Sequence, residues 1–232
     1  MIADETLSER LRGYTVISLN VFNENFLETY DSAYHTAESD EFRWFALRKL
    51  IDCDVERGLG YIVEDLGSDE RELKYRTSIL RDLGYIGSEY PDNMEVCKDK
   101  LIGEAYSYID CFEGWTEEYR TEISNALFFA IADIGDPDSL LFLVRNRAYF
   151  NAVFYGSLAL EKYPTLVAML QSDNSDYQEA ALCLFTLRPY SDLAAILPEI
   201  QALSESNGAL LEELVVLVQE SDYTRPEKWV NR

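Results

Sequence analysis

Apolar residues recur at three- and four-residue spacings along nearly the whole chain, and this feature limits the fold more than any other. Such spacing places apolar side chains on one face of an α-helix, whereas strict alternation would indicate a strand. Alternating runs closed by hairpin turns are absent, and the single Asn-Gly pair is Asn207-Gly208. We therefore predict an all-α protein, with helices over 42–52, 55–66, 73–85 and 94–109 in its N-terminal half.

Residues that cap helix N-termini precede several of the apolar runs. Ser, Thr and Asp side chains accept hydrogen bonds from the first free amides of a helix, and acids in the first turn suit its positive end. The candidate caps are Ser39, Ser68, Thr116 and Ser175. We predict that a helix begins shortly after each of them.

Three prolines in the C-terminal half are spaced almost evenly. Pro137, Pro164 and Pro189 lie 27 and 25 residues apart, and each separates two apolar helical segments. Proline fits the first turn of a helix because its missing N–H would have no partner there. Self-similarity at such a period is typical of stacked helix pairs, so we predict a repeat architecture.

The segment from Ala130 to Val144 resembles a known family. It is similar to the short HEAT repeat of the phycobilisome-lyase type, in which an Ala-rich helix, a Leu/Ile-Gly-Asp-Pro turn and an apolar helix follow one another. The matching residues are Ile134, Gly135, Asp136, Pro137, Leu140 and Leu141. The resemblance is clearest over 120–200, and it implies an α-solenoid of antiparallel helix pairs. It implies little about function, because HEAT-like folds serve scaffolds, inhibitors, lyases and DNA-repair enzymes.

We predict that residues 1–222 form a single helical-repeat domain. Residues 1–37 fit no repeat and are expected to form a helical N-terminal cap, because an end unit must cover an apolar face that no neighbour hides. Irregular helix pairs are expected over 38–111 and HEAT-like repeats over 112–222. A helix-breaking proline lies in 223–232, which we predict to be a C-terminal tail.

The charge balance excludes several classes of partner. Lys and Arg number 20 and Asp and Glu 43, so the net charge is −23 with the one histidine neutral. Nucleic acids and anionic membrane surfaces should repel such a chain. The chain start lacks the basic and apolar regions of a signal peptide, so we expect a cytoplasmic protein with no membrane partner. Its cysteines are expected to be reduced and mostly buried: Cys53, Cys97, Cys111 and Cys183.

No catalytic or cofactor-binding pattern is evident. His35 is the only histidine, so a His-Asp triad or a multi-histidine metal site would need it. Asp31 shares its predicted helix face, yet two ligands cannot close a metal site, and we predict a solvated or capping His35. Gly58-Leu-Gly60 lacks the third glycine of a dinucleotide loop, because Val63 stands in its place. We predict no enzyme activity, no cofactor and no metal.

Acidic residues are concentrated in two segments. Nine acids lie from Glu104 to Asp138 with one base, Arg120, and ten lie from Asp173 to Asp222 with one base. Solubility needs a net charge of only about 2 to 8 in a small domain, and a larger excess weakens the fold by self-repulsion. A cationic partner would explain the excess, and so would an acidic background composition. The predicted partner-binding residues are Glu113, Trp115, Glu117, Glu118, Glu122, Asp133, Asp136 and Asp138.

Trp115 is the predicted anchor of that set. It lies in a Glu113-Gly-Trp-Thr turn between two predicted helices. Tryptophan offers a large contact area with few rotatable bonds, and acids around it would steer a basic partner.

Four function classes follow from these features. The leading hypothesis is a non-enzymatic protein-binding module that neutralises a basic protein, either an immunity protein against a toxin or a nucleic-acid-mimicking inhibitor. The second is a HEAT-repeat scaffold or adaptor, whose binding should depend weakly on salt. The third is a lyase-like HEAT enzyme, which would need a chromophore or a modified protein as substrate. A HEAT-like DNA glycosylase is fourth and lacks the basic groove that it would need. The oligomeric state stays open.

Overall fold

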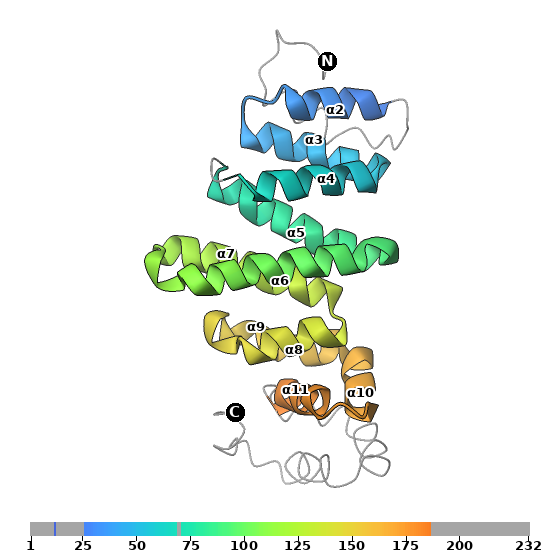
Figure 1. Cartoon of the computed structure of the whole chain (residues 1–232), viewed down its shortest axis with the longest axis vertical. Helices are drawn as coiled ribbons and strands as arrows, with labels where there is room; N and C mark the ends of the chain where they lie inside the picture. Colours follow the sequence, from blue (N-terminus) through green and yellow to red (C-terminus); the bar gives the residue numbers. More distant parts are fainter. Residues whose placement is uncertain (1–11, 13–25, 69–70, 187–232) are drawn as a thin grey trace. The chain divides into compact units, whose positions relative to one another are not determined.

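The computed structural model describes residue 12 and the ranges 26–68 and 71–186 (Figure 1). Every regular element in these ranges is a helix, and none of their residues forms a strand. The all-α prediction is therefore confirmed for this part of the chain. None of the helices described combines the length and the apolar composition needed to cross a membrane.

Contacts divide the chain into two compact units, Met1–Ile134 and Gly135–Arg232. The boundary falls in the Ile134-Gly135-Asp136-Pro137 turn, which the sequence analysis placed inside one helix pair. Gly135 has a φ of 60°, a left-handed conformation that glycine adopts without a steric penalty and that often ends a helix. The single domain over 1–222 stays a prediction, and the predicted tail 223–232 lies outside the described residues.

The first unit consists of six α-helices and two short 3-10 helices within the described ranges. They are α2 (Leu27–His35), α3 (Asp40–Cys53), α4 (Val55–Leu66), α5 (Leu73–Glu89), η2 (Pro91–Asn93), α6 (Met94–Cys111), η3 (Phe112–Gly114) and α7 (Glu117–Ile134). The four helices predicted from periodicity correspond to α3, α4, α5 and α6, and their ends agree to within four residues. Helix α2 lies in the predicted N-terminal cap.

Two of the four predicted caps form the expected hydrogen bonds. Ser39 Oγ accepts from the Phe42 amide and Thr116 Oγ1 accepts from the Tyr119 amide, both at 3.3 Å. A third cap is shifted by one residue. Asn174 Oδ1 accepts from the Asp176 amide at 3.0 Å, and Ser175 is the first residue of its helix.

A helix begins shortly after Ser68, as predicted, but its N-cap residue is Glu72 and not Ser68. Helix α5 begins at Leu73, and the side chain of its N-cap residue Glu72 forms no capping hydrogen bond. The Glu72 amide instead donates to Asp40 Oδ2 at 2.8 Å, so a side chain from α3 satisfies a free amide at the start of α5. A tertiary cap of this kind leaves no local pattern in the sequence.

Helices α3, α5 and α7 form a row in the first unit, and α4 and α6 each pack against their neighbours in the chain (Figure 1). The contact between α5 and α7 is the most extensive of those described. Gly84 permits it, because a Cβ built on Gly84 would lie only 2.5 Å from Ala130 Cα. Fully buried side chains of the row include Leu47, Leu50, Ile79, Leu83, Leu127 and Ile131.

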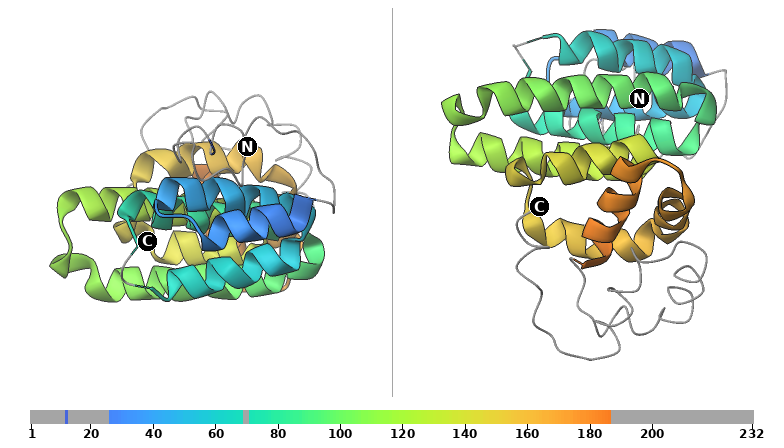
Figure 2. Two further views of the ribbon diagram at one scale, coloured as in Figure 1. Left: turned by 90° about the horizontal axis from the view of Figure 1, so that it is seen from above. Right: turned by 60° about the horizontal axis from the view of Figure 1, so that its bottom comes forward.

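The second unit consists of four α-helices and one 3-10 helix within the described ranges. They are α8 (Pro137–Arg145), η4 (Arg147–Tyr149), α9 (Ala152–Glu161), α10 (Tyr163–Gln171) and α11 (Ser175–Thr186). Helix α11 packs against α8, α9 and α10 and is therefore central to this unit (Figure 2). Pro137 and Pro164 lie in the first turns of α8 and α10, as predicted, whereas Pro189 lies outside the described residues.

Candidate functional site: the acidic and aromatic α6–α7 turn

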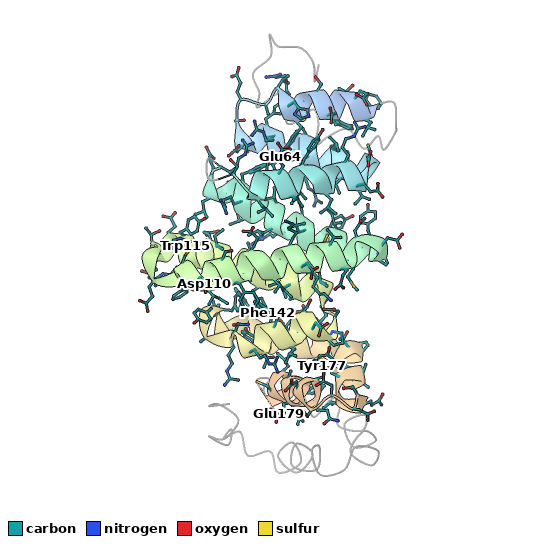
Figure 3. The ribbon with its side chains drawn as sticks, in the orientation of Figure 1. Glu64, Asp110, Trp115, Phe142, Tyr177 and Glu179 are labelled. Carbon is teal, nitrogen blue, oxygen red and sulfur yellow. The ribbon has the colours of Figure 1, made fainter. Side chains whose placement is uncertain are left out.

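The predicted anchor Trp115 lies in the link between α6 and α7. Helix α6 ends at Cys111, η3 follows, and α7 begins at Glu117. Figure 3 shows Trp115 and Asp110 at this end of the helix pair. Thr116, the next residue, caps α7, so the backbone on the C-terminal side of Trp115 is held by a hydrogen bond. The predicted placement of Trp115 between two helices is confirmed.

Trp115 belongs to a cluster of four aromatic side chains. Its ring centroid lies 5.3 Å from that of Tyr108 and 4.5 Å from that of Tyr119, and Tyr108 lies 5.5 Å from Phe112. Tilted and edge-on pairs of this kind contribute about 0.5–1.5 kcal/mol each beyond burial. The buried Tyr108 hydroxyl donates to the Arg120 carbonyl at 3.3 Å, which ties α6 to α7. Trp115 itself is half-buried, so a rigid base presents part of its ring to solvent.

Four exposed acids lie within two helical turns of Trp115 along the chain. Glu113, Glu117, Glu118 and Glu122 form no ion pair within the described residues. Glu117 and Glu118 lie in the first turn of α7, where the helix dipole favours an acid by about 0.3–1 kcal/mol. Glu113 and Glu122 gain nothing comparable from the fold. We call Glu113, Trp115, Glu117, Glu118 and Glu122 the turn surface.

The remaining predicted residues lie elsewhere. Asp133 is exposed in the last turn of α7, about 24 Å along the helix from Glu117 at 1.5 Å per residue. Asp136 and Asp138 belong to the second unit. Asp136 is the N-cap of α8 and its side chain accepts from the Ser139 amide at 2.8 Å, while Asp138 accepts from the Tyr177 hydroxyl. Asp136 and Asp138 therefore each have a hydrogen-bond partner within the second unit.

Asp65 of α4 shows that some acids serve the interior of the first unit. Its buried carboxylate accepts from the Tyr34 hydroxyl at 2.7 Å, from Arg71 Nη2 at 2.6 Å and from the Tyr75 hydroxyl. Burial, followed by these hydrogen bonds, raises the pKa of both tyrosines well above its ordinary value. Sequence reasoning missed this cluster, although Asp65 follows the buried Ile62 by three residues and so occupies the apolar face of its helix.

Asp82 of α5 is a second buried acid. Arg48 Nη1 and Trp44 Nε1 donate to its carboxylate, the latter at 3.0 Å. Burial nevertheless dominates and raises the pKa of Asp82, against the opposing effect of Arg48. The same signal was present in the sequence, because Asp82 follows the buried Ile79 by three residues. Both acids are buried between helices and are not available to a partner.

A small pocket of about 120 Å³ lies at the starts of α3 and α5. It is lined by Asp40, Glu41, Trp44, Glu72, Lys74, Tyr75 and Ser78. Asp40 is already engaged, since its carboxylate lies 3.4 Å from Arg71 and accepts from the Glu72 amide. Because Asp40 is engaged within the fold, we assign this pocket no ligand.

His35 lies in the last turn of α2 and is exposed, in agreement with the predicted solvated role. Its Nε2 lies 3.0 Å from the Tyr61 hydroxyl, which donates to Asp31 at 2.6 Å. The expected common face of Asp31 and His35 is confirmed by the 3.9 Å between their side chains. Within the described ranges no three His, Cys, Asp or Glu side chains are arranged to hold a metal ion.

The four cysteines form no disulfide. Cys97 and Cys183 are buried, as predicted, and Cys53 is half-buried. Cys111 is exposed, so the expectation of burial is wrong for this residue. The reason is its position in the last turn of α6, next to the link that carries Trp115.

No protein-family model, curated protein or solved structure matches this chain. The resemblance of residues 120–200 to HEAT repeats therefore stays a prediction from the sequence.

Proposed function

We propose that the chain is a non-enzymatic, HEAT-like α-solenoid that binds a basic protein through the turn surface and neutralises it. The expected class is an immunity protein against a toxin or a nucleic-acid-mimicking inhibitor. The observation that supports it best is that Glu113, Glu117, Glu118 and Glu122 are exposed, without ion pairs among the described residues, beside a half-buried tryptophan.

Electrostatics supplies the reason for such a surface. A net charge of −23 exceeds what solubility needs, and its self-repulsion weakens the compact state. A basic partner offsets that repulsion on binding, and clustered acids raise the rate of encounter. Trp115 and Tyr119 would then supply the contact area that holds the complex, because buried aromatic residues dominate many interfaces.

The turn surface would neutralise its partner by placing negative charge in the partner's basic cleft. Proteins that act on nucleic acids carry basic clefts that attract phosphate. The carboxylates of the turn surface would occupy such a cleft in place of phosphate. The aromatic cluster would hold the turn that presents them in a fixed conformation. Neither step needs a nucleophile, a metal or a cofactor.

The experiment begins with capture of partners from lysate of the native host, followed by elution in a rising salt series and mass spectrometry. The association rate of the purified partner is then measured for the wild type and for the triple variant Glu113→Lys, Glu117→Lys and Glu118→Lys. We expect at least a tenfold slower association at low salt, with helicity unchanged.

A control variant separates the effect of the turn surface from the effect of total charge. Glu56, Glu64 and Glu89 are exposed acids of the first unit, and their replacement by Lys changes the net charge from −23 to −17, as the turn variant does. This control should bind at nearly the wild-type rate. Equal slowing by both variants would refute the turn surface, and a complex that resists salt would favour the scaffold hypothesis instead.

A further inference from the structure

The second unit contains a pocket of about 490 Å³ between α8, η4 and α11. This volume lies in the range of small-molecule sites, about 300–1,000 Å³. The apolar part of its wall consists of Leu141, Val144, Ala148 and Ala180. The polar part consists of Arg145, Arg147, Asp176, Glu179 and Cys183. Figure 3 labels Glu179 on α11.

The two arginines of the pocket differ in their partners. Arg145 Nη2 lies 2.7 Å from Asp176 Oδ2, and both side chains are more than half exposed. Arg147 is half-buried, and its Nη1 donates to Cys183 Sγ at 3.5 Å. No carboxylate of the described residues lies within ion-pair distance of Arg147. A thiol is a weak acceptor and does not neutralise a guanidinium. The charge of Arg147 and its other N–H donors are therefore available to a ligand.

The surrounding charges limit what that ligand is. Asp176 and Glu179 line the same pocket, and the whole chain carries −23, so a polyanion such as a nucleotide is repelled. A single carboxylate avoids most of this repulsion and matches the planar, two-pronged geometry of a guanidinium. The apolar wall requires that the rest of the ligand be apolar as well.

We propose that this pocket binds a small monocarboxylate with an apolar body. The carboxylate pairs with Arg147, and the body lies against Leu141, Val144 and Ala148. The rim pair of Arg145 and Asp176 stays intact and contributes no net charge. This site is in the second unit, and it is independent of the protein partner proposed for the turn surface.

Three probes with the same carbon chain test the proposal: octanoate, 1-octanol and octylamine, each titrated into the full chain by calorimetry at one ionic strength. The net charge of the protein by itself favours the amine. A preference for octanoate must therefore come from a local positive charge. We expect one site per chain and at least tenfold tighter binding of octanoate than of either analogue.

Two variants locate that charge. Arg147→Gln should weaken octanoate binding at least tenfold, whereas Arg145→Gln, which removes the same charge from the rim, should change it less than threefold. Ala148 is exposed, so Ala148→Trp narrows the pocket without altering the core and should also weaken binding. Circular dichroism establishes that each variant is folded.

Alkylation gives a readout at the site itself. Cys183 is buried and should react slowly with iodoacetamide; because it lines the pocket, octanoate should slow this reaction further and leave the exposed Cys111 unaffected in the same digest. Similar affinity for all three probes, no saturable octanoate binding, or equal losses in the two arginine variants would each overturn the proposal.

Discussion

Gly84 of α5 lies directly against the backbone of Ala130 in α7. A Cβ built on Gly84 would lie 2.5 Å from Ala130 Cα and 2.7 Å from the Ala130 carbonyl oxygen, both closer than such atoms approach in proteins. The two helices therefore meet backbone to backbone. Since α7 carries Glu117, Glu118 and Glu122 in its first turns, this contact also fixes the helix that presents the turn surface.

Gly84→Ala should lower the free energy of unfolding by about 1–3 kcal/mol, because α5 and α7 must separate to admit the methyl group. Gly103 of α6 is the matched control, because a Cβ built there meets nothing within 4 Å. Gly103→Ala should raise the free energy of unfolding by about 0.5–1 kcal/mol through helix propensity alone. Urea denaturation of both variants measures the difference, and shifts of the same sign would contradict the close contact.

Two buried tyrosines on α2 differ in whether the hydroxyl has a partner. Tyr30 Oη is buried and has no hydrogen-bond partner in the described part of the chain, whereas the Tyr34 hydroxyl donates to the buried Asp65 at 2.7 Å. Tyr30→Phe should leave the free energy of unfolding unchanged or raise it by up to about 1 kcal/mol. Tyr34→Phe should lower it by about 1–3 kcal/mol, because the bond to a charged group is lost. Thermal and urea unfolding test both, and a loss in Tyr30→Phe as large as that in Tyr34→Phe would refute the assignment.

Helix positions in the first unit could be predicted from the sequence because they depend on local information. Periodicity places α3 to α6 within a few residues of their observed ends, and Ser39 and Thr116 cap as expected. Interactions between residues that are far apart in the chain could not be predicted in this way. The bond from the Glu72 amide to Asp40 and the contact of Gly84 with Ala130 depend on tertiary packing, which a single sequence does not display.

The candidate site could be proposed from the sequence because it also depends on local information. Residues 113–122 are close in space because they are close in the chain, so their charge density survives folding. Asp136 also has a structural role as the N-cap of α8, which the sequence indicates because an acid directly before a proline is a typical N-cap signal. The pocket around Arg147 could not be predicted from the sequence, because η4, α9 and α10 lie between α8 and α11 in the chain.

Asp136→Ala tests whether Asp136 acts only as a helix cap or also binds the partner. Loss of the N-cap of α8 should lower the free energy of unfolding of the second unit by about 1 kcal/mol, and it should leave the association rate of a basic partner unchanged. Glu122→Ala should instead slow the association with a basic partner and change the free energy of unfolding little. Chemical denaturation and surface plasmon resonance on the same two variants decide the matter. A slower association of Asp136→Ala would support the predicted partner-binding role of this residue.

Cys97 of α6 provides a prediction on pH. It is fully buried, and burial raises the pKa of its thiol from 9.0 to about 11. Between these values the native state holds a proton that the unfolded chain has released, so stability falls as the pH rises. The stabilising contribution of the protonated thiol is complete below pH 9 and is lost toward pH 11.

Buried tyrosines such as Tyr75 act in the same direction. The slope of the free energy of unfolding against pH must therefore be compared with that of Cys97→Ala, which should be shallower. Urea unfolding from pH 8 upward measures both slopes. Identical slopes would show that the Cys97 thiol ionises equally in the two states, and rapid alkylation of Cys97 at pH 8, relative to the exposed Cys111, would show that it is not buried.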